Sequence, residues 1–246
     1  MSKPVVKQIV LASRPTGLPT AENFRLEEVP MRPLPHGGLL LRVLYLSLDP
    51  YMRGRMDDRK SYARSVAIGE AMTGESVCEV LESDRPGYAP GDIVLAHTGW
   101  RTDAAWDGPA PRKLDPKRAP ITTGLGVLGM PGFTAYAGIY LIGKPKAGET
   151  VVVAAASGPV GSLVGQFAKL AGAKAVGIAG GTDKCRYVVD DLRFDACLDH
   201  RAPDLRKSLR RPARKGSMSI SRMSEVRFGR RCCRCSIRLR ACRSAD

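Results

Sequence analysis

The segment that most constrains this chain is VVVAAASGPVGSLVG, which spans residues 151–165. It begins with a run of strand length and composition, and apolar side chains follow at helical spacing over residues 160–171. Gly158 and Gly161 therefore lie where a strand turns into a helix. A backbone without bulky side chains there lets a pyrophosphate reach free amides and the positive end of the helix. The segment thus has the pattern of a dinucleotide-binding turn.

A G-x-x-G sequence also occurs in ordinary glycine-rich turns, so this segment alone leaves both interpretations open. The following residues favour the nucleotide fold, because KAVGIA (residues 174–179) predicts a second strand at the distance of a β-α-β crossover. That strand leads into Gly180 without the acidic residue that would bind a free ribose 2′-hydroxyl, and Lys184 follows. A cation without a carboxylate suits a 2′-phosphate, which favours NADP(H) over NAD. The alternative is that Lys184 is a solvated lysine at a helix start.

Charge is distributed unevenly along the chain. Of its 246 residues 39 are basic and 24 acidic, yet 15 basic and only three acidic residues follow residue 200. Residues 1–200 are therefore nearly neutral, whereas the remainder has a net charge of +12. The basic end lacks interleaved aromatic residues and a recognition helix, so nucleic-acid binding through it is the weakest of the functions considered.

Cysteine and apolar content narrow the class further. Three of the seven cysteines are scattered through residues 1–200 and show neither a disulfide framework nor metal-ligand spacing. The other four follow residue 231, but Cys232 and Cys233 are adjacent and do not form a C-x-x-C knuckle, so no metal site is predicted. No apolar run has membrane-spanning length, and residues 1–35 lack a secretory signal pattern. We expect a globular, cytoplasmic protein.

The first 120 or so residues predict a β-rich domain. Short apolar runs separated by proline and glycine turn signals indicate four strands, over residues 5–11, 38–48, 74–83 and 92–97. Residues 124–143 differ, because small and apolar residues there recur at helical spacing. This segment is expected to lead into the nucleotide-binding domain.

Four stretches resemble a known family: LSLDPYMRGRM (46–56), DRKSYA (58–63), LGVLGMPGFTAY (125–136) and residues 147–185. Over roughly residues 5–205 the chain resembles zinc-independent medium-chain dehydrogenase/reductases, and among them the NADPH-dependent double-bond reductases, which include curcumin and prostaglandin reductases. That group transfers hydride from NADPH to the β-carbon of α,β-unsaturated ketones or aldehydes. Its full-length members are often homodimers.

The resemblance implies an α/β plus β fold. A GroES-like catalytic domain would occupy residues 1–122, and an incomplete Rossmann domain with a doubly wound parallel sheet would occupy 123–205. An irregular basic tail, 206–246, would follow. The implied cofactor-binding residues are the pyrophosphate cradle, the ribose and 2′-phosphate contacts and the adenosine contact, namely Gly158, Pro159, Val160, Gly161, Gly180, Lys184 and His200. His200 occupies a position that usually holds tyrosine.

The implied catalytic residues are Tyr51 and, as a weaker candidate, Tyr62. The phenol of Tyr51 could donate a hydrogen bond to the substrate carbonyl oxygen as enolate charge develops. The alternative for both is an edge-packing tyrosine with its hydroxyl in water. Arg53 and Arg55 could clamp a phosphate or serve as paired structural arginines.

Residues 1–200 lack the GHE-type motif and the four-cysteine lobe of the zinc-dependent relatives, in agreement with hydride chemistry that needs no metal. His36 and His97 have no partner pattern and are interpreted as surface or turn residues.

The resemblance ends near Leu205, where apolar periodicity is lost. The family continues with a signature like ACPKGIDVYFENVGG, in which Asp-Val and Asn-Val are five residues apart. Met218 and Met223 are also five apart, and a shifted reading of each ATG codon yields a codon for Asn, Asp, His or Tyr followed by a codon that begins with G. This coincidence predicts a frameshift between Leu205 and Arg211, and a disordered tail that leaves strand 151–156 without later partners.

Arg193 is a second departure, because the family's LGFD would place glycine at a helix C′ position that needs positive φ. These departures leave two main hypotheses about function. The chain is either an NADPH-dependent enone reductase or a catalytically inactive remnant of one.

Overall fold

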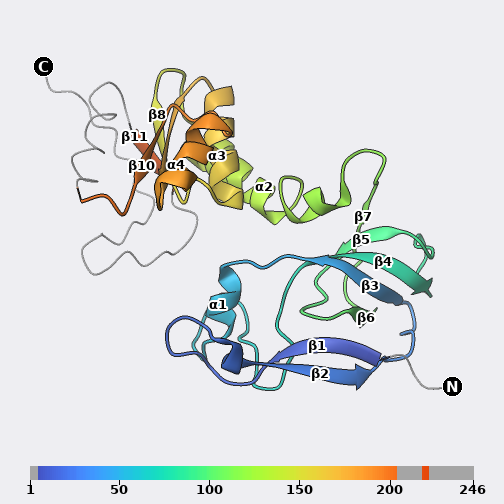
Figure 1. Cartoon of the computed structure of the whole chain (residues 1–246). Coiled ribbons are helices and arrows are strands. Elements are labelled where there is room, and N and C mark those ends of the chain that lie inside the picture. The colour runs from blue at the N-terminus through green and yellow to red at the C-terminus, as the bar shows by residue number, and fades with distance from the viewer. Residues whose placement is uncertain (1–4, 204–217, 222–246) are drawn as a thin grey trace, which may run out of the picture. The chain divides into compact units, whose positions relative to one another are not determined.

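A computed structural model describes residues 5–203 and 218–221 of the chain (Figure 1). The chain forms two compact units, Met1–Leu125 and Gly126–Asp246. The predicted domain boundary at residue 122 falls inside the short 3-10 helix η2, Ile121–Leu125, which ends the first unit.

The first unit is built from antiparallel strands. The strands β1 (Val5–Leu11) and β2 (Phe24–Pro30) pair with each other, joined through the 3-10 helix η1 (Ala21–Asn23). A second sheet has the order β6-β3-β4-β5-β7. Its strands, in chain order, are β3 (Leu39–Leu46), β4 (Ser76–Ser83), β5 (Ile93–Ala96), β6 (Asp103–Trp106) and β7 (Arg112–Leu114).

Alternation of side chains explains the core of the five-stranded sheet. Leu39 and Leu41 are buried on one face of β3, whereas Arg42 is exposed. They cluster with buried residues of the neighbouring strands, namely Cys78, Val80, Val94 and Ala96. Full burial of one such aliphatic side chain stabilises the fold by about 1.5–3 kcal/mol.

A second cluster holds the short helix α1 (Tyr51–Arg55) against the hairpin β1–β2. Met52 and Met56 are buried there with Leu11, and Tyr51 packs against the same cluster from its edge. The buried side chains therefore hold α1, and with it Tyr51, in a fixed position.

The second unit contains a parallel sheet with the order β10-β9-β8-β11. Its strands are β8 (Thr150–Ala154), β9 (Lys174–Ala179), β10 (Ala196–Asp199) and β11 (Met218–Ser221). Its helices are α2 (Met130–Tyr136), the π-helix η3 (Ala137–Gly143), α3 (Pro159–Leu170) and α4 (Thr182–Asp190). In chain order the strands lie 3-2-1-4, as in the first four strands of a Rossmann sheet. The reversal of order falls between β8 and β11.

Strand β11 corrects the prediction of an irregular tail at four residues. Met218–Ser221 pairs in parallel with Thr150–Val153, so β8 has a strand on each edge. The expectation that β8 had lost this partner is wrong. The loss of apolar periodicity after residue 205 predicted that no strand forms in the tail. Parallel pairing depends on backbone hydrogen bonds, which do not require apolar periodicity. The frameshift and the predicted disorder concern residues that otherwise lie outside the described ranges.

Arg193 has φ of +59°, which confirms the left-handed position predicted from the sequence. The strained residue is followed by Phe194, whose ring packs against α3 in the core of the second unit. An ideal Cβ at Gly165 of α3 would lie 1.8 Å from the Phe194 Cζ atom. Glycine at 165 therefore permits the close contact between α3 and the turn after α4.

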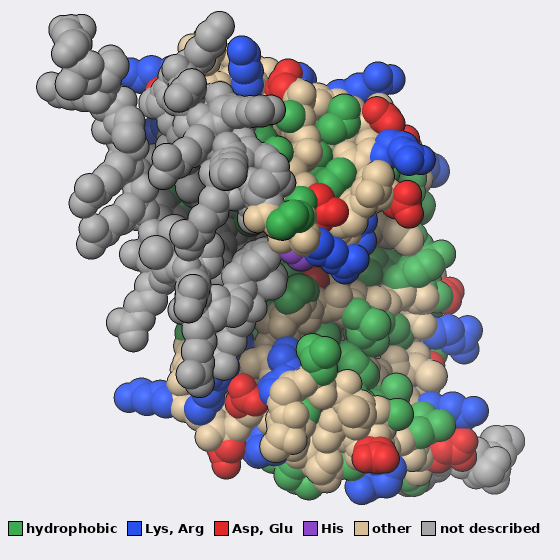
Figure 2. Space-filling view, turned by 60° about the vertical axis from the view of Figure 1, so that its left-hand side comes forward, with side chains coloured by type: hydrophobic (Ala, Val, Ile, Leu, Met, Phe, Trp, Pro, Cys, Tyr) green, Lys and Arg blue, Asp and Glu red, His purple; other side chains and the backbone are tan. Residues whose placement is uncertain are grey.

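Charged side chains of both signs are interspersed over the described surface seen in Figure 2. Ion pairs such as Lys169–Asp195 (2.9 Å) and Lys113–Asp92 (2.6 Å) are examples. Within residues 5–203 and 218–221, no helix combines the length and apolar character that crossing a membrane requires.

Candidate functional site

The turn after β8 and the first three residues of α3, together residues 155–161, are packed tightly onto their own backbone, and we call this segment the nucleotide turn. The Gly158 amide donates to the Ala155 carbonyl oxygen (2.9 Å), and the Ala156 amide donates to the Ile178 carbonyl oxygen of β9 (3.1 Å). Ala155 has φ of +50°. An ideal Cβ at Gly161 would lie 2.3 Å from the Ala155 carbonyl oxygen, so only glycine fits there without a backbone shift.

The nucleotide turn brings together the four residues predicted to cradle a pyrophosphate. Gly158 is the N-cap of α3 and Pro159 is its first residue. Pro159 has no N–H, and the amides of Val160 and Gly161 belong to the first turn, where no helical carbonyl precedes them. These amides and the positive end of the helix dipole form an anion-binding position, which fits the diphosphate of a dinucleotide.

Gly180 and His200 lie together at the ends of β9 and β10. The His200 amide donates to the Ala179 carbonyl oxygen (2.9 Å), and an ideal Cβ at Gly180 would lie 2.6 Å from the His200 Nε2 atom. Glycine at 180 thus leaves room for the imidazole. The structure places His200 beside the predicted ribose-lining glycine.

Asp199 organises the same edge and was not singled out from the sequence. Its Oδ1 atom accepts hydrogen bonds from the Gly181 amide (3.0 Å) and the Arg201 amide (2.9 Å). The bond from Gly181, followed by that from Arg201, lowers the pKa of this carboxyl group. The Asp199 carboxylate therefore connects the turn after β9 to the turn after β10 through these two hydrogen bonds.

Lys184 lies in the first turn of α4 and is exposed. Among the described residues it makes no ion pair within 4.0 Å, so its ammonium group could take a phosphate without losing a partner. Strand β9 itself ends in Ala179 with no carboxylate. This donor set fits a 2′-phosphate better than a free 2′-hydroxyl.

In the first unit, Tyr51 is half-buried at the start of α1. Its hydroxyl lies 3.3 Å from the Nε2 atom of His97. Burial raises the pKa of Tyr51, and the negative charges of Asp49 and Glu75 raise it further. A phenol is already protonated at neutral pH, and these shifts extend that range upward, so Tyr51 can act as a hydrogen-bond donor.

Arg55 joins the two predicted catalytic tyrosines. Its guanidinium carbon lies 4.3 Å from the ring centroid of Tyr62 and 5.8 Å from that of Tyr51. Arg55 is only 7% exposed and donates to the Ala63 carbonyl oxygen (2.8 Å). Tyr62 itself is 85% exposed. We refer to Tyr51, Tyr62, Arg55 and His97 as the Tyr51 cluster.

The other residues near α1 have structural partners. Arg53 forms an ion pair with Asp57 (2.5 Å) and donates to the Gly17 carbonyl oxygen (2.8 Å). Of the two alternatives for Arg53 and Arg55, the structure favours paired structural arginines.

His36 and His97 are both exposed, which confirms their interpretation as surface or turn residues, but each has a partner that the sequence did not indicate. His36 Nδ1 lies 3.0 Å from an Asp84 oxygen, and His97 contacts Tyr51. A separation of 46 residues between Tyr51 and His97 leaves no local sequence signal for their contact.

Comparison with known proteins identifies the family. A model for the N-terminal domain of an oxidoreductase matches residues 7–114. The chain is 53% identical to the NADPH-dependent curcumin reductase of Escherichia coli over 207 residues, which cover 84% of this chain and 60% of that protein. The chain belongs to the zinc-independent medium-chain dehydrogenase/reductase family. Its first unit is accordingly the GroES-like domain of this family and its second a partial Rossmann domain.

A second sequence relative and a solved structure support the family assignment. Prostaglandin reductase 1 of Rattus norvegicus is 43% identical over 188 residues, which cover 75% of this chain and 55% of that protein. The crystal structure of CurA from Vibrio vulnificus in complex with NADPH has a TM-score of 0.77 and 50% identity, over 82% of this chain and 60% of that one. The chain thus spans about 60% of the length of the curated relative it matches in Escherichia coli.

Proposed function

We propose that this protein is an NADP(H)-dependent oxidoreductase that reduces the C=C bond of α,β-unsaturated ketones or aldehydes. The observation that carries the proposal is the nucleotide turn at the start of α3, together with Lys184, which has no ion pair among the described residues and follows a strand that ends without a carboxylate. The names of the relatives, an NADPH-dependent curcumin reductase and a prostaglandin reductase, supply the substrate class.

Different residues of the chain would bind different parts of NADP(H). The α3 amides would hold the pyrophosphate, Lys184 would bind the 2′-phosphate, and Gly180 with His200 would line the adenosine end. When bound, NADPH supplies the hydride.

Tyr51 would bind the substrate. Its phenol would donate a hydrogen bond to the substrate carbonyl oxygen and stabilise the negative charge that develops on it. Tyr62, held on Arg55 beside it, would limit access to that position from solvent.

A titration with NADPH and NADH tests the cofactor assignment. We expect tighter binding of NADPH, and Lys184→Ala should lower NADPH affinity about ten- to a hundredfold, because a charge-assisted contact is lost. Arg186→Ala removes another exposed cation from α4 and is the matched control, which should bind NADPH as the wild type does. Equal binding of NADH and NADPH by the wild type would contradict the assignment.

The second candidate is a catalytically inactive remnant that binds the cofactor without turnover. It is favoured by the loss of the family's pattern after Leu205. Consumption of NADPH with an alkenal or a curcuminoid separates the two candidates. Turnover that Tyr51→Phe slows supports the reductase, and tight NADPH binding with every enone untouched supports the remnant. A protein that binds neither cofactor would contradict both.

A further inference from the structure

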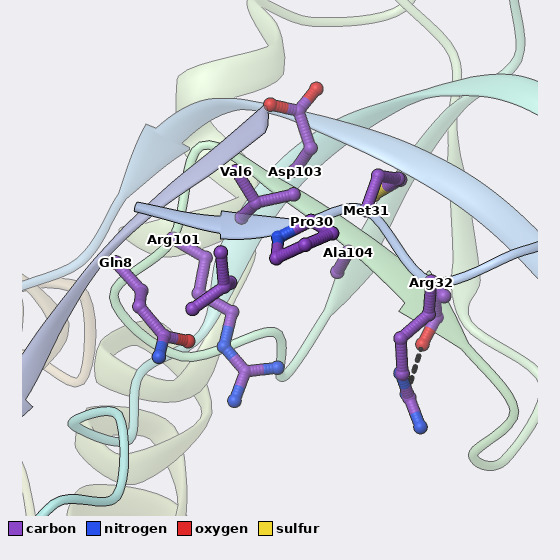
Figure 3. Close-up of a pocket in the computed structure, with 10 residues that line it drawn as sticks. Val6, Gln8, Pro30, Met31, Arg32, Arg101, Asp103 and Ala104 are labelled. Carbon is purple, nitrogen blue, oxygen red and sulfur yellow. Dashed lines mark hydrogen bonds between the residues drawn. The ribbon is translucent and has the colours of Figure 1, made fainter. Parts of the chain in front are cut away.

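A pocket of about 360 Å³ lies in the first unit between the hairpin β1–β2 and the segment that leads into β6 (Figure 3). Its volume is at the lower end of the range of small-molecule sites. It shares no residue with the Tyr51 cluster. Apolar side chains form much of its wall, including Val6, Val29, Pro30, Met31 and Ala104, and two arginines, Arg32 and Arg101, complete it.

The backbone around Arg101 is fixed to β1. The Ile9 amide donates to the Trp100 carbonyl oxygen (3.0 Å), and the Thr102 amide donates to the Lys7 carbonyl oxygen (2.9 Å). Gln8 and Arg101 form an isolated antiparallel bridge between these contacts. The position of Arg101 is therefore set by main-chain hydrogen bonds on both of its sides.

The guanidinium of Arg101 has no compensating carboxylate in the described part of the chain. Its Nε atom is buried and takes part in no hydrogen bond, and among residues 5–203 and 218–221 no carboxylate lies within ion-pair distance of its guanidinium. Burial lowers the pKa of Arg101, and the positive charge of Arg32 lowers it further. A guanidinium nevertheless stays protonated in proteins, so the partly buried Arg101 keeps its positive charge at the pocket and its buried Nε–H keeps no acceptor among the described residues.

The other polar groups of the pocket do not neutralise this charge. Arg32 is exposed at the rim and donates to the Ala105 carbonyl oxygen (2.8 Å). The Asp103 carboxylate points away from Arg101 in Figure 3, and its oxygen lies 3.9 Å from the Arg42 Nε atom. The Gln8 amide donates to Glu27 (3.3 Å). Two cations thus face a mostly apolar cavity.

We propose that this pocket binds a small organic carboxylate. The carboxylate would lie between the terminal nitrogens of Arg101 and the rim guanidinium of Arg32. The body of the ligand, about the size of a phenyl ring, would contact Pro30, Met31 and Ala104. A guanidinium matches the planar carboxylate group, and the apolar wall favours an organic anion over a hydrated inorganic one.

Calorimetric titration of the full chain with benzoate tests the proposal. Benzyl alcohol serves as the neutral ligand of similar shape, and inorganic sulfate serves as the anion without an apolar body. We expect benzoate to bind at least tenfold more tightly than either. Arg101→Met, which keeps the apolar stem, should weaken benzoate about ten- to a hundredfold. Arg59→Met removes an exposed arginine outside the pocket and should leave benzoate affinity unchanged.

A second variant keeps the test decisive if Arg101→Met does not fold. Arg32→Met at the exposed rim should weaken benzoate severalfold, and benzoate should shift the Nε–H resonance of Arg101 in the wild type. The proposal is overturned if benzoate does not bind, if benzyl alcohol or sulfate binds as tightly, or if the arginine variants bind benzoate unchanged.

Discussion

The nucleotide turn is formed by backbone groups, whereas the Tyr51 cluster is formed by side chains. The turn consists of consecutive backbone groups held by close contacts, and a single methyl group at Gly161 would enter the van der Waals space of Ala155. The Tyr51 cluster consists of side chains, three from residues 51–62 and His97 from a distant segment, which contact one another through a hydrogen bond to His97 and the charge of Arg55. Added side-chain volume should therefore disrupt the turn, whereas changes of charge or pH should alter the protonation of the Tyr51 cluster.

The largest expected effect is that of Gly161→Ala. Its Cβ would lie 2.3 Å from the Ala155 carbonyl oxygen and 2.9 Å from the adjoining carbon, so α3 must move away from β8. We expect a loss of about 1–3 kcal/mol in the free energy of unfolding, as for other overpacked sites, and weaker NADPH binding. Urea denaturation and an NADPH titration measure the two effects.

Gly158→Ala is the matched control. It has φ of −85°, and its Cβ would meet only the Ala155 carbonyl oxygen, at 3.2 Å. This substitution should destabilise the protein less than Gly161→Ala does. Equal losses in the two variants would show that the turn is not limited by the contact at residue 161.

A smaller gain in stability is expected from Arg193→Gly. Arg193 holds φ of +59°, and a left-handed conformation is unfavourable for a residue with a Cβ. Glycine should raise the free energy of unfolding by about 1 kcal/mol, since it removes this strain. Thermal and urea denaturation against wild type measure the difference, and Asp191→Gly, where φ is −91°, is the control that should destabilise instead. A variant no more stable than wild type would indicate that the Arg193 conformation carries no strain.

The same contrast explains what the sequence alone could predict. Strand β8, helix α3 and strand β9 follow from neighbouring residues, and all three were predicted. The positive φ at Arg193 was predicted from the family resemblance, which places glycine there. Strand β2 was missed because it buries little, with Leu26 63% exposed. Strand β11 was missed because its alternation of apolar and polar residues, Met-Ser-Ile-Ser, is only four residues long and follows a stretch that has lost its apolar periodicity.

Side-chain constellations were harder to predict. The contact of Tyr51 with His97 joins residues 46 apart, and the pocket at Arg101 is formed where two separate segments meet. In both cases the partners are chosen by the tertiary fold, since neither charge nor spacing along the chain relates them. The family resemblance identified Tyr51 but could not identify His97, because a resemblance transfers only the positions that the two sequences share.

The smallest effect concerns the titration of Tyr51. The folded state raises the pKa of this phenol above its ordinary value of 10.0, mainly by burial and next by the charge of Asp49. The folded protein therefore binds the phenolic proton more tightly than the unfolded chain. This stabilisation is fully present below about pH 10 and is lost as the pH rises through the folded pKa.

Tyrosinate absorbance, measured as wild type minus Tyr51→Phe, should have a higher midpoint in buffer than in urea. Asp49→Asn should move the midpoint in buffer part of the way back, because burial remains when the carboxylate is removed. Identical midpoints in buffer and in urea would mean that Tyr51 is solvated in the folded protein, and the Tyr51 cluster would then lose its protonated donor at the same pH as any exposed tyrosine.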